Sequence, residues 1–243
     1  MNKFTKIITA IMYSIAIVCT MGITLQARGQ SGNGSHNGHE YVDLGLPSGT
    51  LWATCNVGAG TPEASGYYFA WGETQPKPTF SVSNCKYFVF DAHLYRFYQE
   101  RGEAIHGNEE RWYKMTKYSD SDHLTILQPD DDAATVQWGN GWRTPTYDEW
   151  NELIAYCTPK PADSIGVSGI LFKAPNGNSL FLPAIGIRQD NELKYRTNCN
   201  YWSSSLAIDD KSDAIFFLSG AWSELNIGER YMGMPVRAVR SAQ

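Results

Sequence analysis

The order of apolar and polar positions in this chain predicts one main helix and a larger number of short strands. The residues after Thr146 carry an apolar stripe at positions i, i+3, i+6, i+7 and i+10, formed by Tyr147, Trp150, Leu153, Ile154 and Cys157. Thr146 and Glu149 have the spacing of a capping box, and Pro159 and Pro161 end the pattern. We therefore predict a packing helix over about residues 146–157. The carboxylates outside the stripe, including Glu149, are expected to be solvated.

Strand patterns lie on both sides of this helix. On its N-terminal side, EYVDLGLPSGTLWATCNVG indicates a strand, a Pro-Ser-Gly turn and a second strand, and GYYFAWGE indicates another. On its C-terminal side, short strand-like runs are separated by polar or Gly turns. These runs are GILFKAP, NSLFLPAIG, YWSSS, AIFFLSGAWSEL and MPVRAVR. Asn176-Gly177 is a strong hairpin signal. One main helix followed by closely spaced strands favours the α+β class with an antiparallel sheet.

The middle of the chain is less regular. Residues 74–128 mix helical and strand spacings, and we interpret this stretch as an insertion with one short helix near residues 91–101. The stretch PDDDAATVQWG then places Pro129 and three aspartates where a helix begins, because carboxylates are favourable at the positive end of the helix dipole. Three neighbouring aspartates also suggest calcium, but the alternating ligands and the Gly turn of an EF-hand are absent. A solvated helix N-terminus is the preferred interpretation.

The N-terminus has the layout of a secretory signal peptide over residues 1–29. Two lysines precede an apolar run over residues 7–23, and small residues precede a cleavage point after Gly29. A lipoprotein signal that uses Cys19 is less favoured, because the two residues before it are bulky, and a retained membrane anchor is a third alternative. We expect an exported protein, extracellular or on the outer cell surface. Residues 30–39 are expected to be a flexible linker of Gly, Asn and Ser.

Charge and cysteine spacing narrow the class of partner. Removal of residues 1–29 leaves 17 basic and 25 acidic residues, a formal charge of −8. This balance excludes nucleic acid, which needs a basic footprint, and no other segment is apolar enough to span a membrane. Four cysteines remain: Cys55, Cys85, Cys157 and Cys199. They have no CxxC spacing, which argues against zinc and leaves buried free thiols or a structural bridge, with three pairings open.

Several stretches, taken in order, resemble a known family. Over about residues 40–240, the chain is similar to motifs of the Fibrobacter succinogenes major paralogous domain family. The stretches that carry the resemblance are EYVDLGLPSGTLWATCNVGA, GYYFAWGET, DDAATVQWGNGWRTPTYDEWNEL, GNSLFLPAIGIR, YWSSS and VRAVR. That family is similar in fold to C-type lectin-like domains and to formylglycine-generating, sulfatase-modifying enzymes. The resemblance implies a single C-type lectin-like domain over residues 40–243, with an insertion at about 77–112 that is longer than usual.

The resemblance also implies how the parts are arranged. The first strand meets the last strand, PVRAVR, and the main helix packs on the sheet. Trp138, Trp142 and Trp150 are expected to anchor the core, since large aromatic side chains dominate burial. Arg143 is expected to hydrogen-bond backbone carbonyls in its turn. A loop-rich surface over residues 186–231 is left exposed.

Two polar segments of that surface carry the candidate ligand-binding residues. RQDNELKYRTNCN and GAWSELNIGERYMG combine aromatic side chains with adaptable hydrogen-bonding groups, a mixture that suits glycans or protein epitopes. The candidates are Asn191, Lys194, Tyr195, Arg196, Asn198, Trp222, Glu224, Asn226, Arg230 and Tyr231. Asp209, Asp210 and Asp213 lie in the same half of the chain, but the Glu-Pro-Asn and Trp-Asn-Asp motifs of calcium-type lectins are missing. We therefore predict no metal and no cofactor.

These features favour a non-enzymatic binding module that presents a loop surface to a glycan or protein ligand. Alternatives are a structural subunit of a fimbria or surface assembly, and a variable binding protein diversified by a retroelement near its C-terminus. An enzyme similar to the formylglycine-generating group is less favoured. Its chemistry needs a close pair of reactive cysteines, and only Cys199 lies in the C-terminal part. Ser203, Ser204 and Ser205 lack the Gly-x-Ser-x-Gly elbow of a nucleophile, and the oligomeric state is left open.

Overall fold

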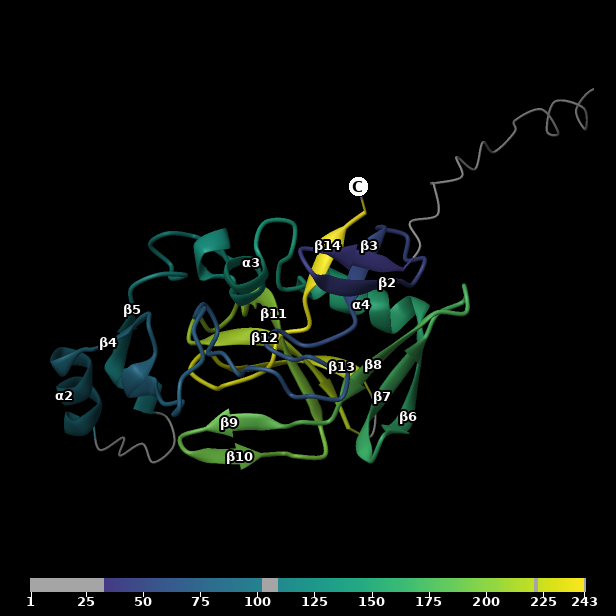
Figure 1. Cartoon of the computed structure of the whole chain (residues 1–243). Coiled ribbons are helices and arrows are strands. Elements are labelled where there is room, and N and C mark those ends of the chain that lie inside the picture. The colour runs from purple at the N-terminus through teal and green to yellow at the C-terminus, as the bar shows by residue number, and fades with distance from the viewer. Residues whose placement is uncertain (1–32, 102–108, 221–222, 243) are drawn as a thin grey trace, which may run out of the picture. The chain divides into compact units, whose positions relative to one another are not determined.

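A computed structural model describes residues 33–101, 109–220 and 223–242 (Figure 1). The fold is mixed α+β: the strands are mostly antiparallel and belong to several small sheets, and the helices are few and short. The described residues all belong to one compact unit. The signal peptide expected at residues 1–29 lies outside the described residues. Within the described ranges, no helix has the length and apolarity needed to cross a membrane.

The first sheet joins the N-terminal strands to the last strand of the chain. Its order is β1-β2-β3-β14. The strands are β1 (Gly34–His36), β2 (His39–Asp43), β3 (Thr50–Ala53) and β14 (Val239–Ser241). β14 pairs antiparallel with β3, and Val239 lies opposite Trp52. The last strand therefore joins the N-terminal sheet, but the expected pairing of the first strand with PVRAVR is wrong, because the partner of β14 is β3.

The flexible linker expected at residues 30–39 is wrong over its described part. From position 34 onward the segment belongs to β1 and β2, which pair with each other. The ring of His39 stacks on Trp138 at a centroid distance of 3.8 Å. The indole nitrogen of Trp142 donates to the carbonyl of His36 at 3.0 Å. These contacts with core aromatics order a segment whose composition is typical of a tether.

The main helix is α4 (Tyr147–Tyr156), as predicted. Thr146 and Glu149 form the capping box at its start, and Trp150 is fully buried. The predicted apolar stripe is wrong at Tyr147, whose side chain is 43% exposed. The reason is that the packed face of this short helix begins one turn later, at Trp150.

The strands β6 to β13, which follow α4, form two three-stranded sheets and a hairpin (Figure 1). One of these sheets contains β6 (Thr158–Ser164), β7 (Val167–Lys173) and β8 (Ser179–Pro183). The other contains β11 (Cys199–Leu206), β12 (Asp213–Ser219) and β13 (Ser223–Glu229). Between them, β9 (Ile187–Gln189) pairs with β10 (Glu192–Lys194). Pro159 and Pro161 lie on β6, an edge strand, where a missing N–H is tolerated. Asn176-Gly177 lies in the predicted turn between β7 and β8, with Gly177 at a left-handed φ of 92°.

The core consists of two main clusters. One includes Trp142, Trp202 and residues of α3 (Ala133–Trp138), and the other is built around Trp150 of α4. The expected core anchors Trp138, Trp142 and Trp150 are confirmed as buried. β11 is buried along its whole length. Residues 186–231, expected to be a loop-rich exposed surface, are therefore largely strands, and part of them belongs to the core.

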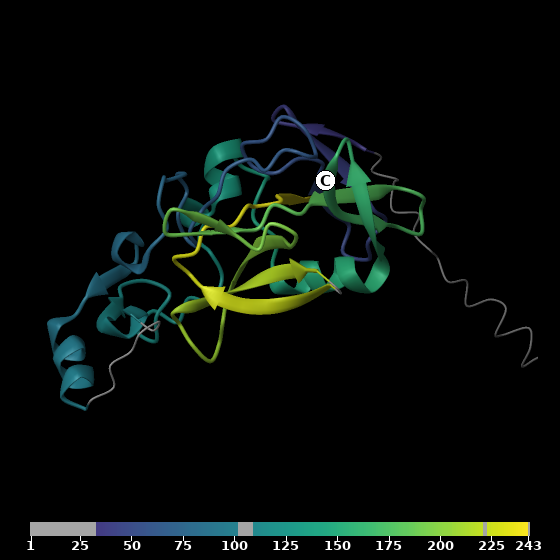
Figure 2. The ribbon, with the colours of Figure 1, turned by 90° about the horizontal axis from the view of Figure 1, so that it is seen from below.

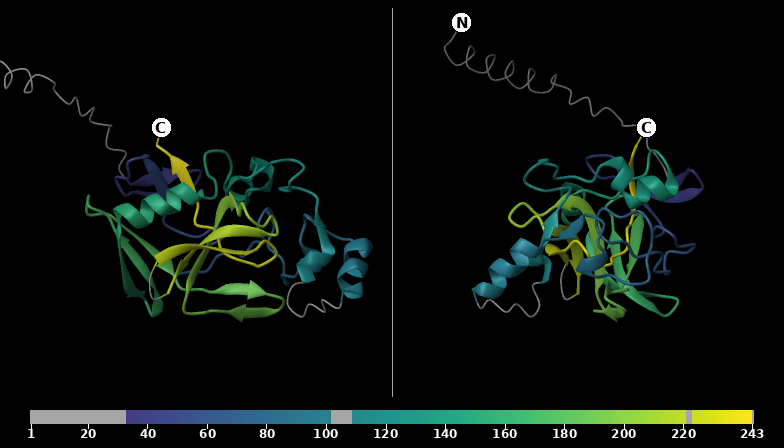
Figure 3. Two further views of the ribbon diagram at one scale, coloured as in Figure 1. Left: turned by 180° about the vertical axis from the view of Figure 1, so that it is seen from behind. Right: turned by 90° about the vertical axis from the view of Figure 1, so that its left-hand side faces the viewer.

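The segment expected to be an insertion forms a small group of elements of its own: η1 (Val82–Asn84), β4 (Phe88–Phe90), α2 (Ala92–Glu100), η2 (Glu109–Trp112) and β5 (Tyr113–Met115). β4 pairs with β5. α2 confirms the short helix predicted near residues 91–101, with Asp91 as its N-cap, and none of its residues is buried. Figures 2 and 3 show α2, β4 and β5 to one side of the sheet formed by β11, β12 and β13.

Candidate functional site

Five of the predicted ligand-binding residues lie together on the β9–β10 hairpin and the turn that follows it: Asn191, Lys194, Tyr195, Arg196 and Asn198. The hairpin turn consists of Asp190 and Asn191, because Gln189 pairs with Glu192. Asp190 adopts a left-handed φ of 54°, which Asp and Asn tolerate better than other side chains. Tyr195 is 62% exposed. This group agrees with the surface position expected for it.

Backbone contacts hold the turn that carries Tyr195. The N–H of Asn198 donates to the carbonyl of Tyr195 at 2.9 Å, and the N–H of Gly186 donates to the carbonyl of Asn198 at 3.1 Å. A Cβ atom at Gly186 would lie 2.2 Å from the carbonyl oxygen of Lys194, so this approach requires glycine. The exposed Tyr195 ring is therefore presented by a defined turn.

The remaining predicted residues do not all join this group. Glu224 and Asn226 are exposed on β13, which is an edge strand of the sheet formed by β11, β12 and β13. In the part of the chain that the structure describes, no hydrogen bond or ion pair connects either residue to the hairpin. Trp222 lies outside the described residues. The predicted set therefore divides between the hairpin and β13.

The structure corrects the role expected for Arg230, because this residue is fully buried. Its guanidinium donates to the carbonyls of Lys117 at 3.2 Å, Tyr118 at 3.3 Å and Lys211 at 3.0 Å. It also lies over the ring of Trp71, 5.0 Å from the centroid. Burial lowers the pKa of Arg230. Arg230 thus joins two backbone segments inside the protein and is not a surface contact.

Tyr231, predicted as a surface contact, is only 9% exposed, and it borders a cleft that the sequence did not predict. We name it the seam cleft, because it lies where η1 and β5 meet the β9–β10 hairpin, and its volume is about 500 Å³. It is lined by Ser81, Val82, Ser83, Tyr113, Gln189, Asp190 and Tyr231. Phe80 and Asp190 form an antiparallel bridge with N···O distances of 3.1 and 2.7 Å. This bridge brings the two walls together.

The seam cleft presents polar groups of several kinds. Asp190 is exposed, and its carboxylate makes no ion pair within the described ranges. The two serine hydroxyls on the η1 side lie 3.0 Å apart, and the amide nitrogen of Gln189 lies 3.5 Å from the hydroxyl of Tyr231. The Nζ of Lys194 donates to the side-chain oxygen of Gln189 at 3.0 Å, which connects the cleft to the predicted hairpin residues. A carboxylate, an amide and hydroxyls therefore converge in one concave site.

A buried carboxylate holds the insertion against the rest of the fold. Asp131 is 2% exposed and accepts hydrogen bonds from Lys86 at 2.9 Å, Lys117 at 2.6 Å, Tyr118 at 2.7 Å and also Tyr87. Burial alone would raise the pKa of Asp131, but these four donors outweigh burial and hold the pKa well below its ordinary value. Burial and the bond to Asp131 raise the pKa of both tyrosines. The wall that carries η1 is thus anchored through its own side chains.

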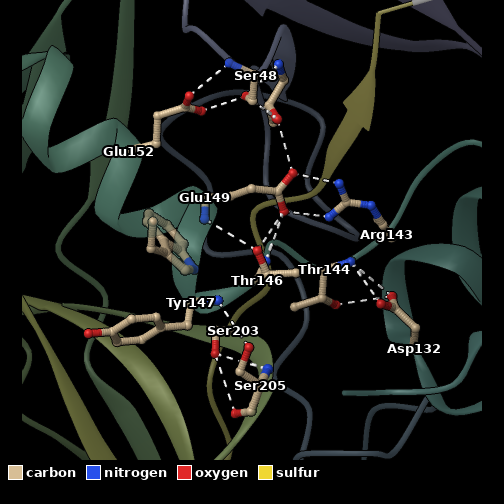
Figure 4. A network of polar contacts seen from close by, with 12 residues as sticks. Ser48, Asp132, Arg143, Thr144, Thr146, Tyr147, Glu149, Glu152, Ser203 and Ser205 are labelled. Atoms are coloured by element: carbon tan, nitrogen blue, oxygen red, sulfur yellow. Dashed lines mark hydrogen bonds and ion pairs between the residues drawn. The ribbon is translucent and has the colours of Figure 1, made fainter. Parts of the chain in front are cut away.

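Asp132 has a related role at the start of α3. Its carboxylate accepts from the N–H groups of Ala134 and Thr135 at 2.9 and 3.1 Å. It also accepts from the N–H and the hydroxyl of Thr144 at 2.8 and 3.0 Å (Figure 4). Burial raises the pKa of Asp132. The solvated helix N-terminus expected for the aspartate run is therefore wrong at Asp131 and Asp132, because both carboxylates have several protein donors.

A further buried network supports the start of α4 (Figure 4). Arg143 pairs with both carboxylate oxygens of Glu149. Glu149 also accepts from the hydroxyl of Thr50 at 3.0 Å and from the N–H of Thr146 at 2.9 Å. Burial alone would raise the pKa of Glu149, but Arg143 and the other donors lower it. Two expectations are thus wrong: Glu149 is buried rather than solvated, and the side chain of Arg143 binds a carboxylate rather than backbone carbonyls.

Two of the three serines considered as nucleophiles contact the main chain through their hydroxyls, whereas the Ser204 hydroxyl has no hydrogen-bond partner among the described residues. The Ser203 hydroxyl donates to a β12 carbonyl at 2.8 Å. The Ser205 hydroxyl accepts the N–H of Tyr147 at 3.0 Å (Figure 4). The Cys199 thiol donates to a β8 carbonyl at 3.3 Å, and burial raises its pKa to about 12. Four cysteines of the described residues are free thiols: Cys55, Cys85, Cys157 and Cys199. The free-thiol alternative is therefore the one that the structure contains.

The described residues contain no group of three or more His, Cys, Asp or Glu side chains that could hold a metal ion. The seam cleft is accordingly interpreted from its hydrogen-bonding groups. Comparison of the chain with protein-family models, curated proteins and solved structures finds no match.

Proposed function

We propose that this chain is an exported, non-enzymatic binding module that holds a glycan in the seam cleft. We also propose the finer fold assignment, a C-type lectin-like domain of the Fibrobacter succinogenes major paralogous type. The sequence motifs and the pairing of β14 with β3 support that assignment. In this proposal the small sheets are the scaffold, and the η1 segment and the β9–β10 hairpin contact the ligand from opposite sides.

The lining of the seam cleft is the observation that carries the proposal. Its volume of about 500 Å³ falls in the range of small-ligand sites. Sugar hydroxyls both donate and accept hydrogen bonds, so they need partners of both kinds. Asp190 supplies an acceptor, and the amide of Gln189 and the serine hydroxyls supply both donors and acceptors. Tyr113 adds partly exposed ring surface, which suits the apolar face of a sugar, and the largely buried Tyr231 borders the cleft beside it.

The concave shape favours a glycan over a protein epitope. Stable protein–protein interfaces bury about 800 Å² on each partner, and a site of that area is broad. The seam cleft is instead a small hollow between two walls. Asn191 and Lys194 continue from it along the hairpin, and the latter already contacts the Gln189 side chain. A second sugar unit would extend in that direction.

The other candidate functions have less support. Formylglycine-generating chemistry needs reactive thiolates, and burial that raises the pKa of Cys199 to about 12 opposes thiolate formation. The hydroxyls of Ser203 and Ser205 are engaged with the main chain. A structural subunit of a surface assembly is the second candidate. Phe90 and Phe97, each 50% exposed beside β5 and on α2, favour it as an apolar contact surface.

A glycan array probed with residues 30–243 tests the proposal. We expect retention on a limited set of glycans. Asp190→Asn keeps the left-handed turn, because Asn tolerates it as well as Asp does, but removes the negative charge of the cleft. Loss of charge-assisted hydrogen bonds is expected to weaken binding at least about tenfold. Glu224→Gln removes one exposed carboxylate on β13 and serves as the matched control, with binding unchanged.

Two results would count against the proposal. Equal binding by wild type and Asp190→Asn, combined with loss of binding in Glu224→Gln, would move the site to β13. The absence of glycan binding, together with self-assembly detected by light scattering, would favour the structural subunit.

A further inference from the structure

A second cleft lies beside the last strand of the chain, and its volume is about 560 Å³. We name it the β14 cleft. Its walls are residues 240–242 at the end of β14, residues 140–144 before α4, and residues 126–129, which lead into η3 (Pro129–Asp131). Ser204 of β11 also lines it. The β14 cleft shares no lining residue with the seam cleft.

Two side chains that line the β14 cleft are buried and carry polar atoms without partners. Arg240 is 6% exposed and Ser204 is 3% exposed. Among the residues that the structure describes, neither the Nε of Arg240 nor the Oγ of Ser204 has a hydrogen-bond partner. Native proteins pair nearly all buried polar groups with protein or solvent. Two orphaned groups on one cleft therefore indicate that the cleft is built to receive a polar ligand.

The positive charge of Arg240 is also unmatched. Its guanidinium lies over the ring of Tyr41, 5.3 Å from the centroid, and it forms no ion pair within the described ranges. The second arginine of the cleft, Arg143, is already paired with Glu149. The carboxylate of Asp132 is occupied by N–H and hydroxyl donors. The cleft thus contains one buried cation whose counter-ion is missing.

We propose that the β14 cleft binds the carboxylate of an acidic sugar. The guanidinium of Arg240 donates parallel N–H···O hydrogen bonds to the carboxylate, an arrangement that its planar geometry favours. The Ser204 hydroxyl donates a further bond. Asn140, Thr146 and Ser241 line the same cleft and offer amide and hydroxyl groups to the hydroxyls of the sugar.

The single unmatched charge selects among anions. A carboxylate carries one negative charge and is neutralised by Arg240 alone. A phosphate monoester carries between one and two charges at neutral pH and would keep an uncompensated charge in a buried site, which is unfavourable. Because none of these residues lines the seam cleft, this proposal stands or fails separately from the proposed function.

Calorimetric titration of residues 30–243 with D-glucuronate and with D-glucose tests the proposal. Glucuronate is expected to bind at least about tenfold more tightly than glucose, because only glucuronate forms charge-assisted bonds to Arg240. Arg240→Met keeps a long apolar stem, removes the charge, and is expected to abolish the difference between the two sugars. Arg96→Met, on the exposed helix α2, is the matched control and keeps the difference. Ser204→Ala is expected to weaken glucuronate binding several-fold.

Thermal unfolding separates a binding role of Arg240 from a structural one. Without ligand, Arg240→Met is expected to unfold at the same or a higher temperature than wild type, because an unpaired buried charge has been removed. Glucuronate is expected to raise the midpoint of wild type only. A lower midpoint or a failure to fold in Arg240→Met would assign the residue to the scaffold and overturn the proposal. Equal binding of glucose and glucuronate would also overturn it, as would equally tight binding of the peptide carboxylate N-acetyl-diglycine.

Discussion

The half-buried pair of Arg143 and Glu149 predicts a large loss of stability when Glu149 is replaced by Ala. The Glu149 side chain is 11% exposed and accepts hydrogen bonds from Arg143, Thr50 and Thr146. Removal of one partner from a buried pair costs about 3–5 kcal/mol of unfolding free energy. The Arg143 side chain is 38% exposed and can be partly solvated after the change, which reduces the cost. We therefore expect a loss of about 2–4 kcal/mol.

Urea denaturation of residues 30–243 measures this loss. A domain of this size has an m-value of about 2–3 kcal/mol per molar urea, so the midpoint is expected to fall by about 1 M. Glu152→Ala is a matched control on the same helix, because the Glu152 carboxylate is partly exposed and accepts its hydrogen bonds from Ser48 near the surface. Its expected loss is at most about 1 kcal/mol.

A double variant checks the assignment to this pair. The double variant Arg143→Ala/Glu149→Ala is expected to lose less unfolding free energy than the sum of the losses in the two single variants. The reason is that each substitution then removes a side chain whose partner is already absent. Equal losses in Glu149→Ala and Glu152→Ala, or strict additivity in the double variant, would refute the reasoning.

Three further predictions concern the scaffold. Trp150→Ala is expected to cost about 3–5 kcal/mol, because the fully buried indole stacks on Phe217 at 4.6 Å; a loss below about 1 kcal/mol in urea denaturation would place Trp150 outside the core. The pKa of Asp131 is lowered in the folded state, so its ionised carboxylate stabilises the fold. This stabilisation is complete at pH values above about 3.9, the pKa of the unfolded carboxyl, and it is lost as the pH falls toward the pKa of the folded state. Between about pH 5 and pH 2, the thermal midpoint is therefore expected to fall less steeply in Asp131→Asn than in wild type. Asp130→Asn, at an exposed position, is the control and is expected to follow wild type. Parallel curves for all three proteins would show that Asp131 does not contribute to the pH dependence of stability. Titration of residues 30–243 with a thiol reagent is expected to modify Cys55 first and all four cysteines after denaturation, whereas two reactive thiols in denaturant would indicate a disulfide.

Local signals in the sequence were sufficient for several elements. Thr146 and Glu149 indicated the start of α4, and Asn176-Gly177 indicated a hairpin turn, because caps and tight turns depend on a few adjacent residues. The burial of Glu149 was missed, because a carboxylate in the first turn of a helix ordinarily faces solvent. Arg143 across the preceding turn and Thr50 on β3 both bind that carboxylate and make it part of the interior.

Contacts between residues far apart in the sequence explain why the burial of Asp131 and the seam cleft were not predicted. Asp131 is buried by Lys86 and Tyr87, which lie 45 and 44 positions earlier, and no local pattern indicates that pairing. The seam cleft depends in the same way on the bridge between Phe80 and Asp190. Polar and aromatic composition could indicate the hairpin half of the site. The η1 half became visible only when the fold brought the two walls together.

The central claim is that the seam cleft holds a glycan and leaves it chemically unchanged. Hydrogen–deuterium exchange of residues 30–243, with and without a glycan selected on the array, tests this claim most directly. We predict slower exchange over residues 81–84 and 189–192, unchanged exchange over β13, and recovery of the glycan intact. Protection confined to β13, or conversion of the glycan into a product, would contradict the claim.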